Sequence, residues 1–241
     1  MPELRDAIAA HYGRTQGLSL TRDNVVVTSG ATEAIAAAIL ATVSPGDEVI
    51  LFAPAYDAYA PMVRRAGGTP VHVALQPPLW HYRREEIVAR ITPRTKVMIV
   101  NDPLNPTGTV ASPEELAMLA EICCEHDLFA ICDEVWEAVR FDGQRHQSLL
   151  AQPGMAERGV KIGSGGKIFG VTGWKIGWLC AAPAVAAVLA RVHQFLTFTT
   201  PPALQYALAE GLARPELGER RLSGWAQTRD ALSTALAREG L

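Results

Sequence analysis

Six short apolar runs, each ending in polar or turn residues, constrain the fold of this chain more than any other sequence feature. Runs of this length and composition are typical of buried strands, and several of the segments between them have the pattern of helices. Strands that alternate with helices predict an α/β fold with a mostly parallel sheet flanked by helices. The six runs are NVVVTSG (24–30), DEVILFAP (47–54), TPVHVAL (69–75), KVMIVNDP (96–103), LFAICDE (128–134) and VKIGSGG (160–166).

One helix begins with strong N-terminal signals, in the segment SPEELAMLAEICCEHD. Ser112 is the expected N-cap, Pro113 suits the first turn, and Glu115 completes a capping box. Its apolar residues recur on one face, which predicts that the helix packs against the sheet. These apolar residues are Leu116, Leu119, Ile122 and Cys123.

The domain organisation follows from where the composition changes along the chain. Residues 1–213 contain no repeat, low-complexity tract or obvious linker, so we expect one large domain there. Residues 214–241 shift towards charge and long-helix character, which predicts a boundary near residue 214 and a long helix after it.

Charge and composition exclude several classes of function. The net charge of -3 comes from interspersed charges without a basic stripe, so we expect no nucleic-acid partner. No apolar run is long enough to cross a bilayer, and the charged N-terminus does not resemble a signal peptide, which predicts a cytoplasmic protein without a membrane partner. The six histidines lack metal-ligand spacing, so we expect no metal site. We expect reduced thiols at Cys132 and Cys180, which lie in apolar runs.

Ligands of an open parallel sheet bind beyond the carboxyl ends of its strands, and two of the predicted strands are followed there by suitable groups. After the first strand, Gly30 allows a tight turn, and Ala31 and Thr32 open a helix whose free N–H groups favour a phosphate. Taken alone, the segment is explained more simply as an ordinary strand-to-helix turn. After the second strand come Tyr56 and Tyr59, either a ring-stacking platform or plain rim and core aromatics.

Two further strands end in amides and carboxylates. NDPLNPTG follows the fourth run and contains Asn101 and Asn105, and the bond between Asn105 and Pro106 is a candidate cis peptide. Asp133 and Glu134 end the fifth run, where a buried carboxylate requires a cationic or hydrogen-bonding partner.

Three familiar motifs do not fit the glycine-rich segment KIGSGGKIFGVTGWKIG. A P-loop requires glycine at Lys161 and serine or threonine at Ile168, and a dinucleotide fingerprint also requires glycine at Ile168. A serine-hydrolase elbow around Ser164 requires glycine at Ile162. A lysine amine at Lys167 remains, together with an acid, an asparagine, an aromatic ring and a phosphate-compatible helix start, which are the five groups that pyridoxal phosphate requires.

On these residues the sequence resembles the class I and II aminotransferases of fold type I, within the branch of kynurenine, methionine and aromatic aminotransferases. Asn-x-Pro-x-Asn-Pro-Thr-Gly, Asp-Glu-Val, and Ser-x-x-Lys followed by Gly-Trp-Lys-x-Gly occur in the order and spacing of the family. The resemblance runs through nearly all of residues 1–213. It implies a three-layer α/β/α large domain that binds pyridoxal 5'-phosphate and acts on an amino acid and a 2-oxo acid.

The resemblance also implies roles for individual residues. Lys167 corresponds to the Schiff-base lysine and Asp133 to the acid paired with the pyridinium nitrogen. Asn105 would hold the phenolic oxygen, Tyr56 would stack on the ring, and Asn101 would lie near the substrate carboxylate. The positions around the phosphate would be Gly30, Ala31, Thr32, Ser164 and Lys175.

Two of these positions depart from the family pattern. Lys175 stands where many relatives have arginine, so it supplies a point charge without the bidentate fork. Trp136 stands where many relatives have a tyrosine bonded to the ring oxygen, and its indole N–H donates but neither ionises nor accepts.

The resemblance leaves three functions open. We expect the N-terminal segment and the small domain of the family to be missing, so the chain resembles a truncated large domain, and residues 214–241 would lead towards that small domain. An aminotransferase, a truncated cofactor-binding fragment without turnover, and a carbon-sulfur β-lyase on the same scaffold all fit. The family pattern further implies a homodimer, with Phe198 and Thr199 of QFLTFTTPPALQ near the neighbouring subunit's pocket.

Overall fold

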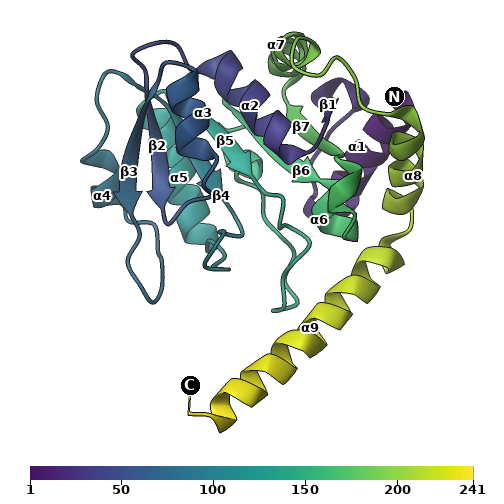
Figure 1. Ribbon diagram of the computed structural model, residues 1–241. Helices are drawn as coiled ribbons and strands as arrows, with labels where there is room; N and C mark the ends of the chain where they lie inside the picture. The colour runs from purple at the N-terminus through teal and green to yellow at the C-terminus, as the bar shows by residue number, and fades with distance from the viewer. Residues whose placement is uncertain (241) are drawn as a thin grey trace.

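A central sheet of seven strands organises the computed structural model, which describes residues 1–240 (Figure 1). All six predicted strands are confirmed, and each lies within the apolar run that predicted it or extends beyond it by one residue. Their bounds are β1 Val25–Thr28, β2 Glu48–Ala53, β3 Thr69–Ala74, β4 Thr95–Asn101, β5 Phe129–Asp133 and β6 Gly159–Ser164.

The seventh strand, β7 (Gly177–Ala181), was absent from the sequence prediction. The strand order is β1-β7-β6-β5-β4-β2-β3. Strands β2 to β6 pair in parallel, whereas β7 is antiparallel to both β1 and β6. The predicted mostly parallel sheet is therefore confirmed, and β7 is the antiparallel strand that joins β1 to the rest of it.

Helices cover both faces of the sheet, which confirms the three-layer α/β/α arrangement (Figure 1). Strand β2 illustrates the division, because Val49 and Leu51 pack with α2, α3 and α7, whereas Ile50 and Phe52 pack with α4 and α5. Helices α1 and α8 pack together near β1 and β7. The helices are α1 Pro2–Gln16, α2 Ala31–Thr42, α3 Tyr59–Arg65, α4 Arg84–Val88, α5 Pro113–Glu125, α6 Gly165–Phe169, α7 Pro183–Gln194, α8 Pro202–Leu212 and α9 Pro215–Arg238, with short 3-10 turns at Arg22–Asn24, Leu149–Ala151 and Thr172–Trp174.

The local predictions for α5 are confirmed. The Ser112 side chain accepts from the Glu115 N–H at 3.2 Å, and a Glu115 carboxylate oxygen accepts from the Ser112 N–H at 2.8 Å. The predicted apolar face is buried. The Asn105–Pro106 peptide is cis, as its sequence allowed.

Helix α9 differs from the other α-helices of residues 1–240 because none of its residues is buried. It follows α8 and extends past the body of the molecule towards the C-terminus (Figure 1). The division into residues 1–213 and 214–241 stays a prediction. Cys123, Cys124, Cys132 and Cys180 are free thiols, and no helix within residues 1–240 is long and apolar enough to cross a membrane.

Candidate active site

The segments that follow β1, β2, β4, β5 and β6 line one pocket of about 200 Å³, which we call the strand-end pocket. Because the carboxyl ends of parallel strands meet at one edge of a sheet, residues far apart in the sequence converge there. Every site residue predicted from the sequence lines this pocket. They are Gly30, Ala31, Thr32, Tyr56, Asn101, Asn105, Asp133, Trp136, Ser164, Lys167 and Lys175.

One end of the pocket is built from the start of α2 and the side chain of Lys175. Gly30 has φ 88°, a conformation that glycine adopts easily, and it places the free N–H groups of the first α2 turn at the pocket. Gly177 allows β7 to approach this turn, since a Cβ there would lie 2.5 Å from the Ala31 nitrogen. The Lys175 ammonium lies beside Gly30. A helix N-terminus and an ammonium together favour an anion such as a phosphate.

Asp133 lies at the end of β5 with only 4% of its surface exposed. Its carboxylate accepts from the Tyr59 hydroxyl and, at 3.4 Å, from the Val135 N–H. Within residues 1–240 no lysine, arginine or histidine forms an ion pair with it. Burial therefore raises the pKa of Asp133 to about 6, although these hydrogen bonds and the more distant charge of Lys167 oppose the rise. The pocket thus contains a buried carboxyl group that lacks a cationic partner.

The two tyrosines after β2 occupy different places. Tyr56 lines the pocket, whereas Tyr59 is buried and donates to Asp133, and their rings meet edge to face with centroids 5.5 Å apart. Both tyrosines were candidates for a ring-stacking platform, and the resemblance to the family assigned that role to Tyr56 alone. The sequence around Tyr59 could not predict its hydrogen bond to Asp133, because the two residues are 74 positions apart in the chain.

The side-chain amide of Asn101, unlike a free pocket group, already forms hydrogen bonds within the chain. The Asn101 amide donates to the Asp133 carbonyl at 2.8 Å and accepts from the Asn105 N–H at 2.8 Å, so it ties the loop after β4 to the end of β5. Asn105 also lines the pocket. The predicted contact of Asn101 with a substrate carboxylate stays a prediction, because its amide already has two partners within the chain.

Lys167 lies on α6, and its ammonium nitrogen is 4.5 Å from the centre of the Trp136 ring. Two α9 residues that the sequence did not indicate as site residues support this pair. Trp225 packs against Trp136 with ring centroids 6.4 Å apart, and Arg221 donates to the Lys167 carbonyl while its guanidinium lies 3.8 Å from the Trp225 ring centre. Helix α9 therefore contacts both the backbone of Lys167 and the ring beneath its amine.

Comparison with known proteins gives a consistent family match. The family model for aminotransferase class I and II matches residues 1–241. The methionine aminotransferase of Escherichia coli is 43% identical over 97% of this chain and 61% of its own length. Human kynurenine--oxoglutarate transaminase 1 is 39% identical over 93% of this chain and 56% of its own length.

Solved structures agree with the sequence relatives. The N-succinyldiaminopimelate aminotransferase of Mycobacterium tuberculosis superimposes with a TM-score of 0.95 and 40% identity, over 98% of this chain and 63% of that one. An aspartate aminotransferase from Thermus thermophilus gives a TM-score of 0.93 at 34% identity, over 64% of its length. The chain therefore spans about three fifths of the length of these relatives.

Proposed function

The chain belongs to the class I and II aminotransferases, and on this premise we propose that it transfers an amino group from an L-amino acid to a 2-oxo acid with pyridoxal 5'-phosphate as its cofactor. One observation carries the proposal. A buried carboxyl group without a cationic partner, Asp133, faces the same pocket as a lysine amine, Lys167, and a helix N-terminus suited to phosphate.

The chemistry of the strand-end pocket fits pyridoxal phosphate. The protonated ring nitrogen of the cofactor would give Asp133 an ion pair, which no lysine, arginine or histidine within residues 1–240 provides. The start of α2, Ser164 and Lys175 would hold the phosphate, and the Lys167 amine would hold the aldehyde carbon. Asn105 would donate to the phenolic oxygen, and the Tyr56 ring would cover the pyridine ring.

Bound pyridoxal phosphate supplies an electron-withdrawing ring that stabilises the negative charge left when an amino acid loses its α-proton. Lys167 would take that proton, because its amine is the basic group at this end of the pocket. Asp133 would keep a proton on the ring nitrogen. Trp136 would support the Lys167 amine through its ring face, in place of the hydroxyl that many relatives have there.

Assembly and location form part of the same proposal. Phe195 and Phe198, in the segment between α7 and α8, are 85% and 72% exposed, and exposed aromatic side chains favour a protein partner. We expect this segment, which includes Thr199, to face a second copy of the chain in a homodimer. The free thiols and mixed surface charge suit a cytoplasmic location. Sedimentation with cofactor present tests the dimer, and a stable monomer would contradict it.

The experiment that tests the function uses the fact that the chain has only four lysines, Lys96, Lys161, Lys167 and Lys175. Borohydride reduction of the cofactor-loaded protein followed by peptide mapping should place the label on Lys167. Transfer of ¹⁵N from labelled methionine to an unlabelled 2-oxo acid should accompany it. Both signals should vanish in Lys167→Ala and persist in Lys96→Ala, which removes an exposed lysine on β4.

Two results would contradict the proposal. A label on any other lysine would exclude the assigned role of Lys167. Release of pyruvate and a free thiol from a cysteine conjugate, without amino transfer, would instead indicate the β-lyase.

A further inference from the structure

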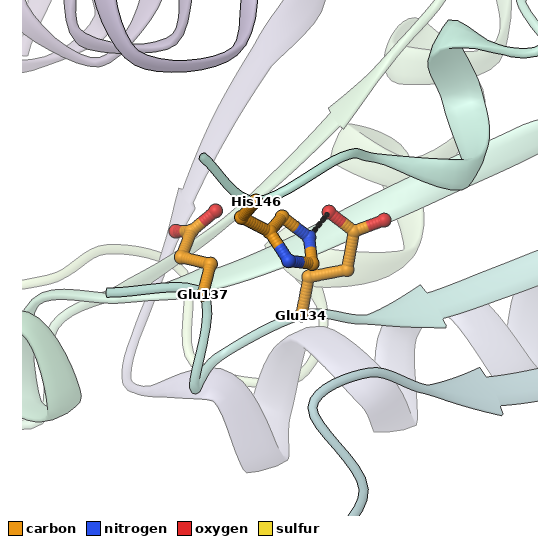
Figure 2. A group of neighbouring side chains, drawn as sticks. All are labelled: Glu134, Glu137 and His146. Carbon is orange, nitrogen blue, oxygen red and sulfur yellow. Dashed lines mark hydrogen bonds and ion pairs between the residues drawn. The ribbon is translucent and has the colours of Figure 1, made fainter. Parts of the chain in front are cut away.

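A second buried polar cluster begins at Glu134, the residue after Asp133. Glu134, Glu137 and His146 face one another there (Figure 2), and one ligand atom from each lies within 4.8 Å of the others. All three are buried. Two carboxylates and an imidazole form a donor set that suits a divalent cation.

Lys161 already supplies a cation to this cluster. Its side chain is fully buried, and its ammonium pairs with Glu134 and, at 2.6 Å, with Glu137. The same nitrogen lies 4.6 Å from the centre of the Tyr12 ring. Burial favours the neutral amine, but the two carboxylates outweigh burial and raise the pKa of Lys161, so the ammonium is kept. We call Glu134, Glu137, His146 and Lys161 the internal ion cluster.

The internal ion cluster joins the two segments that carry the central groups of the strand-end pocket. Glu134 follows Asp133 directly, and Glu137 follows Trp136. Lys161 lies on β6, opposite Cys132 of β5, three residues before Ser164 and six before Lys167. The ion pairs therefore hold the turn after β5 against β6, the strand that leads to Lys167.

The carboxylates of the cluster are anchored on their other sides as well. Glu134 accepts from His146 at 2.8 Å and from the Ser148 hydroxyl at 2.9 Å. Glu137 accepts from the Tyr12 hydroxyl at 2.8 Å, and that hydroxyl accepts from the Trp178 indole at 2.8 Å. The turn is thus fixed to β6, α1 and β7, and a shift of Lys161 would remove the one cation that both carboxylates share.

We propose that Lys161 is a positioning residue for the strand-end pocket: its ammonium replaces a metal ion as the cation that fixes Asp133 and Trp136 relative to Lys167. This inference rests on the proposed function, since it concerns how the pocket receives pyridoxal phosphate. It assigns Lys161 no contact with cofactor or substrate.

Two variants test the role of the ammonium without leaving both carboxylates unpaired. Glu137→Gln keeps Lys161 and Glu134, and Lys161→Met/Glu137→Gln removes one charge of each sign. Leu119→Ala is the control, because Leu119 is a buried α5 residue outside both sites whose loss also lowers stability. The measurements are the dissociation constant of pyridoxal phosphate, its visible circular dichroism when bound, and thermal unfolding.

We expect the double variant to bind pyridoxal phosphate roughly tenfold more weakly. Removing a group that holds ligand-binding residues in place often lowers the affinity for the ligand by at least this factor. The circular dichroism of the cofactor bound to the double variant should differ from that of the wild type. In Glu137→Gln the affinity and the spectrum should change in the same direction but by less, and Leu119→Ala should keep the wild-type spectrum. Wild-type spectra and affinity in a folded Glu137→Gln or double variant would overturn the inference. Stoichiometric Zn²⁺ binding by the wild type that Glu137→Gln abolishes would also overturn it, since the ammonium leaves no place for a second cation.

The wild-type measurement separates this inference from the proposed function. If the wild type bound no pyridoxal phosphate at Lys167, the proposed function would fail. If it bound the cofactor and the variants matched it, only the role of Lys161 would fail.

Discussion

Asp133 and Glu134 are adjacent in sequence and equally deep in the protein, yet they belong to two regions with opposite electrostatics. Burial raises the pKa of Asp133 to about 6, and no lysine, arginine or histidine within residues 1–240 forms an ion pair with it. Burial also disfavours ionisation of Glu134, but Lys161 and His146 outweigh it and lower the pKa of Glu134 to about 2. Contact with a cation, rather than depth, decides the charge of a buried acid.

The difference separates a region built for stability from one built for a ligand. In the internal ion cluster the charges compensate one another within the chain. In the strand-end pocket Asp133 lacks that compensation, which is the state expected of a group that awaits a cationic ligand.

Removing the cation of the internal ion cluster should cost the most stability. Lys161→Met leaves Glu134 and Glu137 buried without their ammonium, and breaking a buried pair in this way typically costs about 3–5 kcal/mol. Asp133→Asn should change the free energy of unfolding far less, because it removes an uncompensated charge. Urea denaturation of both variants measures the difference, and equal losses would refute the contrast.

In the strand-end pocket the expected effect is on turnover. Asp133→Asn should slow amino transfer by about 10²–10⁴-fold, because a neutral amide does not hold the proton on the ring nitrogen. Far-ultraviolet circular dichroism should show the fold intact. An unchanged rate in an active preparation would remove Asp133 from its assigned role.

The pH dependence of stability should have opposite signs in the two regions. Asp133 binds its proton more tightly in the folded chain than in the unfolded chain. Its contribution to the free energy of unfolding is therefore largest below its usual pKa of 3.8 and falls by about 3 kcal/mol as the pH rises to 6 and above. Glu134 has the opposite effect, because its pKa is lowered in the folded chain. Its contribution to the free energy of unfolding increases as the pH rises from about 2 to 4.5.

The difference in unfolding free energy between wild type and Asp133→Asn isolates the first effect. Burial also raises the pKa of Asp102 to about 6, but Asp102 is present in both proteins. We expect this difference to change by about 2 kcal/mol between pH 4 and pH 7 without cofactor, and by less with it. A difference that stays constant over this range would show that Asp133 titrates normally.

The smallest expected effect concerns one hydrogen bond of the internal ion cluster. Ser148→Ala removes a donor to Glu134, and a hydrogen bond to a charged group contributes about 1.5–3 kcal/mol at most sites. Because Glu134 keeps Lys161 and His146, we expect a loss near the lower end. Ser19→Ala, at an exposed serine, is the control and should change stability by less than about 0.5 kcal/mol. Equal behaviour of the two variants would show that Ser148 does not support Glu134.

Much of the site was predictable because its residues follow strands that are visible as local apolar runs. Asp133 and Asn101 were placed by position alone, since both end such a run. The resemblance to the family then assigned roles to these and to Lys167 and Lys175. Strand β7 was not predicted, because its apolar run is short and follows directly on the glycine-rich segment that contains Lys167.

The sequence by itself determined the α/β class, six of the seven strands and the set of groups that the strand-end pocket brings together, because each depends on residues close along the chain. Only the tertiary structure decided the partner of Tyr59, the contacts of Arg221 and Trp225 with the pocket, and the burial of Lys161. In the sequence Lys161 served only to exclude a P-loop, and a lysine is ordinarily expected at the surface. Its partners lie 27 and 24 residues away, and no local pattern encodes a cation that is compensated only when two distant segments pack together.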